Sequence, residues 1–126
     1  MHLPEYAELL RVFIGDSDRH HGKPLYEAIV EAAREHHLAG ATVLRGYLGY
    51  GAHSRIHTAK ILRLSEDLPI VVEIVDAPDK IEDFLPVLDE MMAEGMVTVE
   101  QVKVLTYRHH AGEEGQARLS RRRSRR

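Results

Sequence analysis

The hydrophobic residues repeat with two different periods along this chain, and the order of those periods constrains the fold more than any other feature. A period of two, or a short β-branched run, is typical of strands, and a period of 3.6 is typical of helices. Strand-like segments are residues 9–14, 41–51, 69–75 and 97–107, and helix-like segments are residues 24–40 and the stretch from Pro78 to Gly95. The predicted order is therefore strand–helix–strand–strand–helix–strand.

Proline, glycine and one aspartate mark the expected ends of the two helices. Pro24 and Pro78 suit the first turn of a helix, where the missing N–H is no loss. Gly40 lies where a left-handed residue would end the first helix, and Gly95 ends the second. Asp76 precedes Pro78 and is expected to cap the second helix.

This order of elements predicts one α+β domain, because two right-handed split β-α-β units build a single antiparallel sheet. The expected fold is a ferredoxin-like βαββαβ sandwich, with four antiparallel strands and both helices on one face. Residues 69–75 and 97–107 nevertheless keep apolar side chains on both faces. We therefore expect oligomerisation to cover the face that the helices leave open.

The charge of the chain is unevenly distributed. Residues 1–117 contain 11 basic and 20 acidic residues, a net charge of −9, whereas residues 118–126 contain six arginines and no acid. An acidic body argues against sequence-specific binding of nucleic acid, which needs a basic face for the phosphates. We expect a domain over residues 1–110 and a solvated, flexible arginine-rich tail over 111–126, although such a tail also suits RNA, DNA or acidic lipid.

Composition also bears on the compartment of the protein. No apolar run approaches the roughly 18 residues of a membrane span, and the N-terminal sequence MHLPEYAELLRVFIG lacks the pattern of a signal peptide. The chain contains no cysteine, which excludes disulfides and thiolate chemistry. We expect a cytoplasmic protein that is not itself embedded in a membrane.

The segment RGYLGYG, residues 45–51, is the least ordinary part of the sequence. Gly46, Gly49 and Gly51 would let a ligand or another chain approach the backbone, or they would permit bulges and twist where a strand leaves the sheet. Tyr47 and Tyr50 would stack on an adenine or another planar group, or they would pack in an interface. Both interpretations remain open at this point.

The residues around this segment add positive charge and histidine. Arg45 and Arg55 offer charge to an anion, and an arginine can bind such a group through two hydrogen bonds. His53 and His57 have a spacing that can bind metal on a helix, but this stretch offers no third ligand, so no metal site is expected. The favoured interpretation of His53, Ser54, Arg55 and His57 is a surface loop that contacts a partner.

No arrangement typical of catalysis is found in the sequence. Ser17, Ser54 and Ser65 lie in no nucleophile-elbow context. Asp16 and Asp18 are neighbouring carboxylates in a polar loop, and they are expected to form a turn. The chain is therefore not expected to be an enzyme.

Several longer segments resemble one known family. GKPLYEAI, GATVLRGYLGYG, the LP of EDLPIVVEIVD, and EGMVTVEQV are similar to domain-of-unknown-function family 190 (UPF0166-type), which is related to the PII signal-transduction proteins. The resemblance runs from about residue 9 to 108. It implies a PII-like ferredoxin fold and a homotrimer with the sheets turned inward. It also implies a long loop between the second and third strands, the T-loop, here at residues 52–66.

The resemblance further implies a ligand site. PII proteins bind ATP or ADP between subunits through a glycine-containing segment at the base of the T-loop. The residues at the matching positions are Arg45, Gly46, Tyr47, Gly49, Tyr50, Gly51 and Arg55. PII proteins also have a lysine-containing phosphate loop before the last strand, and here only Gly95 remains, with Lys103 as the nearest lysine. Simple anions and AMP-like or dinucleotide-like ligands are therefore favoured over ATP.

Together these observations lead to a functional hypothesis. The chain is expected to be a PII-like regulatory protein, a homotrimer that senses a small anionic or nucleotide-like molecule between subunits. It would act through loop 52–66 on a partner such as a membrane transporter or channel. Two alternatives stay open, namely a ligand-independent interaction module and a metal-ion-tolerance protein of similar trimeric fold.

Overall fold

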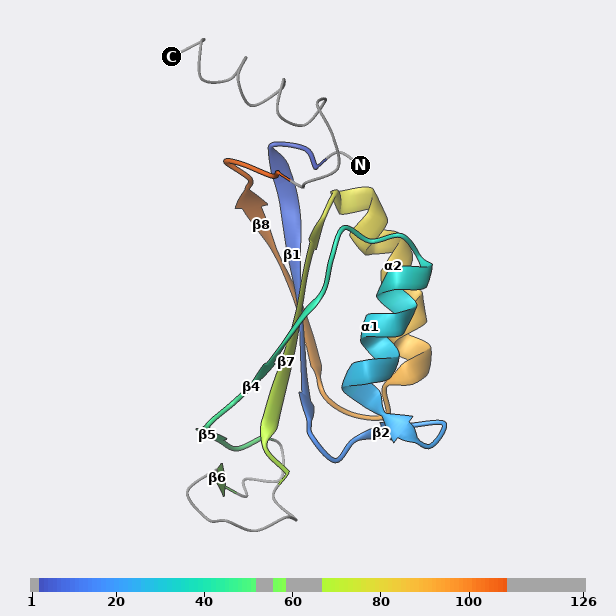
Figure 1. Ribbon diagram of the computed structural model, residues 1–126, viewed down its shortest axis with the longest axis vertical. Helices are drawn as coiled ribbons and strands as arrows, with labels where there is room; N and C mark the ends of the chain where they lie inside the picture. The colour runs from blue at the N-terminus through green and yellow to red at the C-terminus, as the bar shows by residue number, and fades with distance from the viewer. Residues whose placement is uncertain (1–2, 52–55, 59–66, 109–126) are drawn as a thin grey trace.

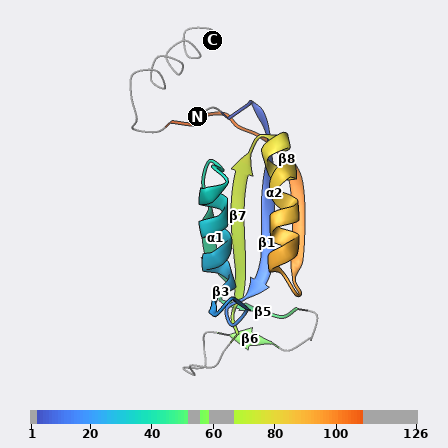
Figure 2. The same ribbon diagram turned by 90° about the vertical axis from the view of Figure 1, so that its right-hand side faces the viewer.

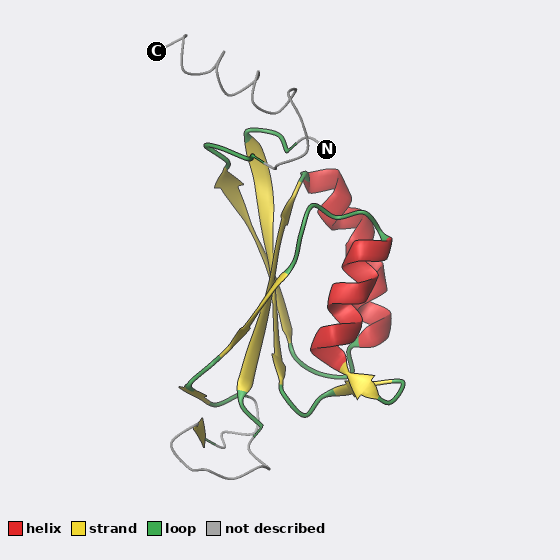
Figure 3. Cartoon of the chain, viewed as in Figure 1, coloured by secondary structure: helices red, strands yellow, loops and turns green. Residues whose placement is uncertain are grey.

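A computed structural model describes residues 3–51, 56–58 and 67–108 of the chain (Figure 1). The main strands form one antiparallel sheet of four strands in the order β4-β7-β1-β8, and both helices lie on the same face of it (Figure 3). This confirms the ferredoxin-like sandwich. The elements of the sandwich are β1 (Tyr6–Gly15), α1 (Leu25–Glu35), β4 (Thr42–Arg45), β7 (Pro69–Asp76), α2 (Pro78–Met91) and β8 (Met96–Lys103).

The core lies between the two central strands and the helices. Alternate residues of β1 and β7 face the helices and are buried, and the strands pair so that Val12 lies opposite Val72. These side chains pack against the apolar stripes of both helices. The buried members of the core include Leu10, Val12, Ile14, Ile29, Ala33, Ile70, Val72, Ile74, Ile81, Phe84 and Leu88.

The first helix ends earlier than the sequence predicts, so the expected cap at Gly40 is wrong. His37 has a left-handed backbone with φ 60° and follows the C-cap residue His36. The N–H of His37 donates to the Arg34 carbonyl and the N–H of Leu38 to the Ala33 carbonyl, which is the pattern of a Schellman motif. Burial of Leu38 accompanies this turn. At the other end of α1, Pro24 is the N-cap itself rather than part of the first turn.

Asp76 does not cap the second helix as predicted. Ala77 is the N-cap of α2, and Pro78 occupies the first helical turn as expected. The Asp76 side chain is buried, and its two oxygens accept hydrogen bonds from the Ala39 N–H at 2.8 Å and the Ala77 N–H at 2.7 Å. The carboxylate thus joins the end of β7 to the segment that follows α1.

Glycine is needed where α2 gives way to β8. Gly95 has φ 124°, and a Cβ placed there would lie 2.7 Å from the carbonyl oxygen of Phe13. Its predicted role at the end of the second helix is wrong, because α2 ends at Met91 with Met92 as its C-cap. Gly95 lies in the turn before β8, where backbone conformation and close approach require a glycine. The helix itself continues through Pro86 to Met91.

Two short strand pairs extend from the sandwich. β2 (Arg19–His20) and β3 (Lys23–Pro24) form a hairpin that directly follows Asp16 and Asp18, in the polar loop of the sequence. The turn has positive φ at His21 and Gly22, as two-residue hairpins favour. The predicted strand 41–51 is divided, because β5 (Leu48–Gly49) leaves the main sheet and pairs with β6 (His57–Thr58).

The buried carboxylate of Asp76 gives a testable prediction for stability. Asp76→Ala should lower the free energy of unfolding by about 2–3 kcal/mol, because hydrogen bonds to a charged group are strong and two N–H donors lose their acceptor. Asp79→Ala, at an exposed acid in the first turn of α2, is the matched control. It should cost less than about 1 kcal/mol. Urea unfolding measures both, and equal effects would contradict the structural role of Asp76.

Candidate functional site

The face of the sheet opposite the helices is open. No described element covers it (Figure 1). The register of the strands places these residues on it: Leu9, Arg11 and Phe13 of β1, Leu44 of β4, Val71, Glu73 and Val75 of β7, and Met96, Thr98 and Glu100 of β8. Leu44 is 48% exposed and Met96 is 53% exposed. The uncovered apolar face expected from the sequence is therefore present in the protomer.

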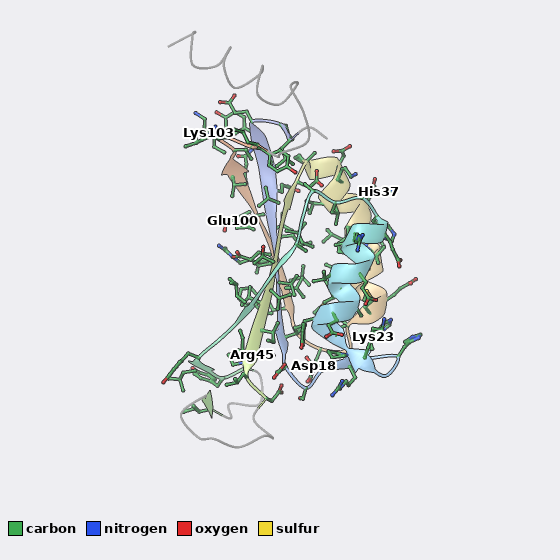
Figure 4. All side chains as sticks on the ribbon, viewed as in Figure 1. Asp18, Lys23, His37, Arg45, Glu100 and Lys103 are labelled. Carbon is green, nitrogen blue, oxygen red and sulfur yellow. The ribbon has the colours of Figure 1, made fainter. Side chains whose placement is uncertain are left out.

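One ion-pair network crosses the middle of this open face. Arg11 Nε donates to Glu73 Oε2 at 2.9 Å, and Arg11 Nη1 donates to Glu100 Oε1. The hydrogen bond to Glu73, followed by that to Glu100, raises the pKa of Arg11 above its ordinary value. The network connects β7, β1 and β8, and Glu100 lies on the side of the sheet away from the helices (Figure 4).

The segment at the base of loop 52–66 lies at one end of the sheet. Arg45, the last residue of β4, donates from Nη2 to Asp16 Oδ1 at 2.9 Å. This hydrogen bond is the main cause that raises the pKa of Arg45. Asp18 lies at the same end (Figure 4), and its Oδ2 accepts from the Gly15 N–H at 2.9 Å, as expected of a turn residue. Asp16 and Asp18 thus have local structural partners.

The three glycines of this segment have different surroundings. A Cβ at Gly46 would lie 2.5 Å from Pro69 Cγ, and a Cβ at Gly49 would lie 3.1 Å from the same atom. The Gly46 N–H also donates to the Pro69 carbonyl at 2.6 Å. Among the described residues, a Cβ at Gly51 would meet nothing within 4 Å. Packing against Pro69 therefore explains Gly46 and Gly49, whereas the described residues give no steric reason for Gly51.

Large apolar side chains are exposed around these glycines. Tyr47 is 61% exposed and Tyr50 is 71% exposed, and Leu48 and Ile56 are similarly accessible. The ring faces of the two tyrosines are thus available to a planar ligand or to another protein chain. We call Tyr47, Leu48, Tyr50 and Ile56 the loop-base cluster.

Some of the predicted site residues belong to the part of loop 52–66 that the structure does not describe. His53, Ser54 and Arg55 fall outside the described residues, as does most of loop 52–66. The backbone of His57 pairs with Gly49 in the short β5–β6 ladder. Among the described ranges 3–51, 56–58 and 67–108, no three potential metal-ligating side chains lie together. No helix in those same ranges is long and apolar enough to cross a membrane.

Sequence reasoning missed the residues that hold the returning end of the loop. Asp67 Oδ1 accepts from the Ser17 N–H at 2.8 Å, and the Asp16 N–H donates to the Leu68 carbonyl at 2.9 Å. A Cβ on Gly15 would lie 2.5 Å from Asp67 Oδ1. These contacts join positions about 50 residues apart, so no local periodicity or turn motif indicates them.

The fold is that of the PII-like proteins. The structure is similar to that of CPII from Thiomonas intermedia, described as a nitrogen regulatory PII-like protein bound to ADP, AMP and bicarbonate. The TM-score is 0.54 at 17% sequence identity, and the match covers 79% of this chain and 88% of that one. At this identity the likeness concerns the fold.

The family is shown by the sequence itself. Residues 7–104 match the model of the family described as DUF190: Uncharacterized ACR, COG1993, and the chain belongs to this family. It is 40% identical over 100 residues to a UPF0166 protein of Aquifex aeolicus, covering 78% of this chain and 92% of that protein. It is 33% identical over 86 residues to UPF0166 protein MJ1524 of Methanocaldococcus jannaschii, covering 68% and 79%. The resemblance found in the sequence is thus confirmed.

The different surroundings of the glycines predict different tolerance to substitution. Gly46→Ala should lower the free energy of unfolding by about 1–3 kcal/mol, the usual cost of overpacking, because the added methyl group collides with Pro69. Gly51→Ala adds the same atom where no described residue lies within 4 Å, and it should leave stability within about 0.5 kcal/mol of the wild type. Thermal and urea unfolding compare the two variants. A Gly46→Ala protein as stable as Gly51→Ala would show that Pro69 does not require this glycine.

Proposed function

We propose that this protein is a PII-like regulatory protein, a homotrimer that senses a small anionic or nucleotide-like ligand between its subunits. The observation that carries the proposal is the loop-base cluster, which projects accessible aromatic rings beside Gly51 at one end of a PII-like sheet. The structural relative CPII binds ADP, AMP and bicarbonate, which supports adenine nucleotides or anions as the ligand class. Loop 52–66, which connects to this cluster, would carry the response to a partner.

The trimer is proposed from the open sheet face. An apolar surface of this kind is rarely left to solvent in a monomer, and the helices of the same chain are already committed to the other face. Identical copies offer one another the same surface, so closed symmetric assembly is the simplest cover. In such an assembly the base of one loop would face a neighbouring subunit, and the ligand site would include both.

The charges near the sheet ends favour a small anion over a triphosphate. Arg45 lies at the loop base and keeps about half of its side chain exposed while paired with Asp16. The turn between α2 and β8 contains Glu94 where a phosphate loop would need a lysine. Arg55, whose position is outside the described residues, would add a second positive charge. Adenosine monophosphate, related dinucleotides and bicarbonate-sized anions are therefore the ligands we propose.

The remaining assignments follow from this role. We propose residues 1–110 as the regulatory domain and residues 111–126 as a separate arginine-rich tail, which lies outside the described residues. A transporter or channel in the membrane is the partner class we propose for loop 52–66, with the protein itself in the cytoplasm. No catalytic residue is assigned. A protein-interaction module without ligand is the function that would replace this one if no ligand binds.

The trimer can be tested by placing a charge on the open face. Val71→Asp should abolish the trimer, because the trimer would bury a carboxylate that has no positively charged partner. Such a buried charge costs about 3–5 kcal/mol per subunit. Val97→Asp is the matched control, since Val97 lies on the same sheet but faces the helix side. Light scattering should give three times the protomer mass for the wild type and the control. A monomeric wild type at micromolar concentration would contradict the trimer.

The ligand site can be tested where the protomer has room for a side chain. Gly51→Val should abolish binding of the ligand by filling the proposed cleft, without disturbing the protomer. Gly40→Val is the control, because Gly40 also has open space around it and lies beyond the opposite end of β4. Arg55→Ala should weaken binding of an anion by about 1.5–3 kcal/mol. Calorimetry against AMP, ADP, ATP, cyclic dinucleotides and bicarbonate measures these effects.

Two outcomes of that calorimetry would count against the proposal in different ways. No binding to the wild type by any compound of the panel would reject ligand sensing and favour the interaction module. Wild-type affinity in Gly51→Val would instead reject the loop base as the wall of the site.

A further inference from the structure

A groove runs between α2 and β8 on the helix side of the sheet, away from the open face. Its volume is about 750 Å³, and Figure 2 shows α2 in front of the edge strand β8. Val97 and Val99 of β8 line it and are 38% and 40% exposed, whereas their neighbours Val12 and Leu10 on β1 are fully buried. The helices cover the middle of the sheet and leave this edge uncovered. The lining residues include Leu85, Pro86, Leu88, Met92, Val97 and Val99.

The rim of the groove is acidic. Glu82 and Asp89 of α2 line it and are exposed. The ion pairs formed among the described residues include neither of them. Helix α2 as a whole carries five acidic residues and only one lysine. The groove therefore combines an apolar floor with a negative potential, which disfavours phosphates and other anions.

Pro86 adds a hydrogen-bond acceptor to this rim. In a regular helix the N–H of residue 86 would donate to the carbonyl of Glu82, and proline has no N–H. The Glu82 carbonyl thus lacks its helical donor, and it lies on the same element as the Glu82 and Asp89 carboxylates. Guanidinium groups, which carry five donors in a planar fork, suit such a set of acceptors.

The chain itself contains a segment of complementary chemistry. Residues 118–126, RLSRRRSRR, carry six arginines and one large apolar residue, Leu119, and no acid. Arginine side chains can lay their apolar stems on a surface while the charged ends reach acids at its rim. If a second copy of the domain docked here groove to groove, it would instead bring two acidic α2 helices together. Charge complementarity therefore favours the arginine-rich tail over another domain as the occupant.

The tail is long enough to reach the groove. The described chain ends at Arg108, shortly after β8 ends at Lys103. Val99 lies back along β8 by about 13 Å from Lys103 at the usual rise of a strand, and the five residues from Lys103 to Arg108 add at most about 17 Å. Residues 109–117 span up to about 30 Å when extended. This linker can turn back along β8 and bring residue 118 to the groove of the same chain.

We propose that residues 118–126 bind in the α2–β8 groove of their own chain, with Leu119 against Val97 and Val99 and the arginines at Glu82 and Asp89. The contact is electrostatic and exposed, so it is reversible and weakens with salt. An anionic partner of the arginines would compete with the groove for the tail. The groove then acts as an internal binding site that keeps the tail from such partners until one of them displaces it.

Cross-linking of the full-length chain tests the proposal, because the natural sequence contains no cysteine. The pair Ala93→Cys and Ser120→Cys places one thiol at the exposed end of the groove and one in the tail. A disulfide forms only when the two Cβ atoms approach to about 4 Å. The control pair is Gly40→Cys and Ser120→Cys, because Gly40 is exposed and follows α1, which ends at the same end of the sheet as β8.

We expect the groove pair to form an intrachain disulfide at least tenfold faster than the control pair under mild oxidation at low salt. Adding Glu82→Gln and Asp89→Gln, or 1 M salt, should slow the groove pair several-fold. Adding Glu27→Gln and Glu35→Gln on α1 should not. Mass spectrometry detects the intrachain disulfide, and mixtures of the single-cysteine chains detect cross-links between chains.

Three results would overturn the proposal. Equal rates for the groove pair and the control pair would show that the tail has no preferred position. Insensitivity of the groove pair to the Glu82→Gln and Asp89→Gln changes would remove the electrostatic basis of the contact. Cross-links that form only between chains would show that the groove holds another copy's tail.

Discussion

The sheet has four strands and only two helices to cover it, and the rest of the structure depends on this imbalance. The helices seal one face over β1 and β7, where Leu10, Val12 and Val72 are completely buried. The described elements leave the opposite face and the helix-side edge of β8 uncovered, although both carry apolar residues. The same packing that stabilises the core therefore creates two surfaces that can bind something else, one broad and nearly flat and one narrow with an acidic rim.

The loop between β4 and β7 depends on contacts at its two ends. On the outgoing side, Gly46 packs on Pro69 and donates its N–H to the Pro69 carbonyl. On the returning side, Asp67 accepts the N–H of Ser17, and Leu68 accepts that of Asp16. The outgoing end is thus fixed to the start of β7, and the returning end is fixed to the turn after β1. A binding loop on rigid stems presents its residues at a defined place on the scaffold, which suits the role proposed for the loop-base cluster.

Sequence periodicity was sufficient for the elements of the sandwich but not for their ends or for the site. The alternation around Val12 and the apolar stripe around Phe84 are local signals, and the structure confirms the strand and the helix that they indicate. The local sequence predicts a helix cap at Asp76 because its hydrogen-bond partner Ala39 lies 37 residues away and leaves no local signal. The sequence does not indicate the end of α1, because the Schellman turn uses His37 in a left-handed conformation that glycine more often adopts. The sequence leaves the roles of the glycines around Tyr47 ambiguous, because Gly46 and Gly49 are explained by contact with Pro69, which is distant in sequence.

The charges on the open face are paired within each protomer. In an assembly of identical copies every subunit would bring this same network to the buried face. Arg11 lies between Glu73 and Glu100 and is hydrogen-bonded to both. Each carboxylate thus has a positive partner before any surface is buried, which reduces the cost of taking it out of water. Removing Arg11 would leave two acids per subunit without that partner, whereas the apolar residues around them would be unchanged. The proposed association through this face would therefore depend on a charged network as well as on the apolar area that surrounds it.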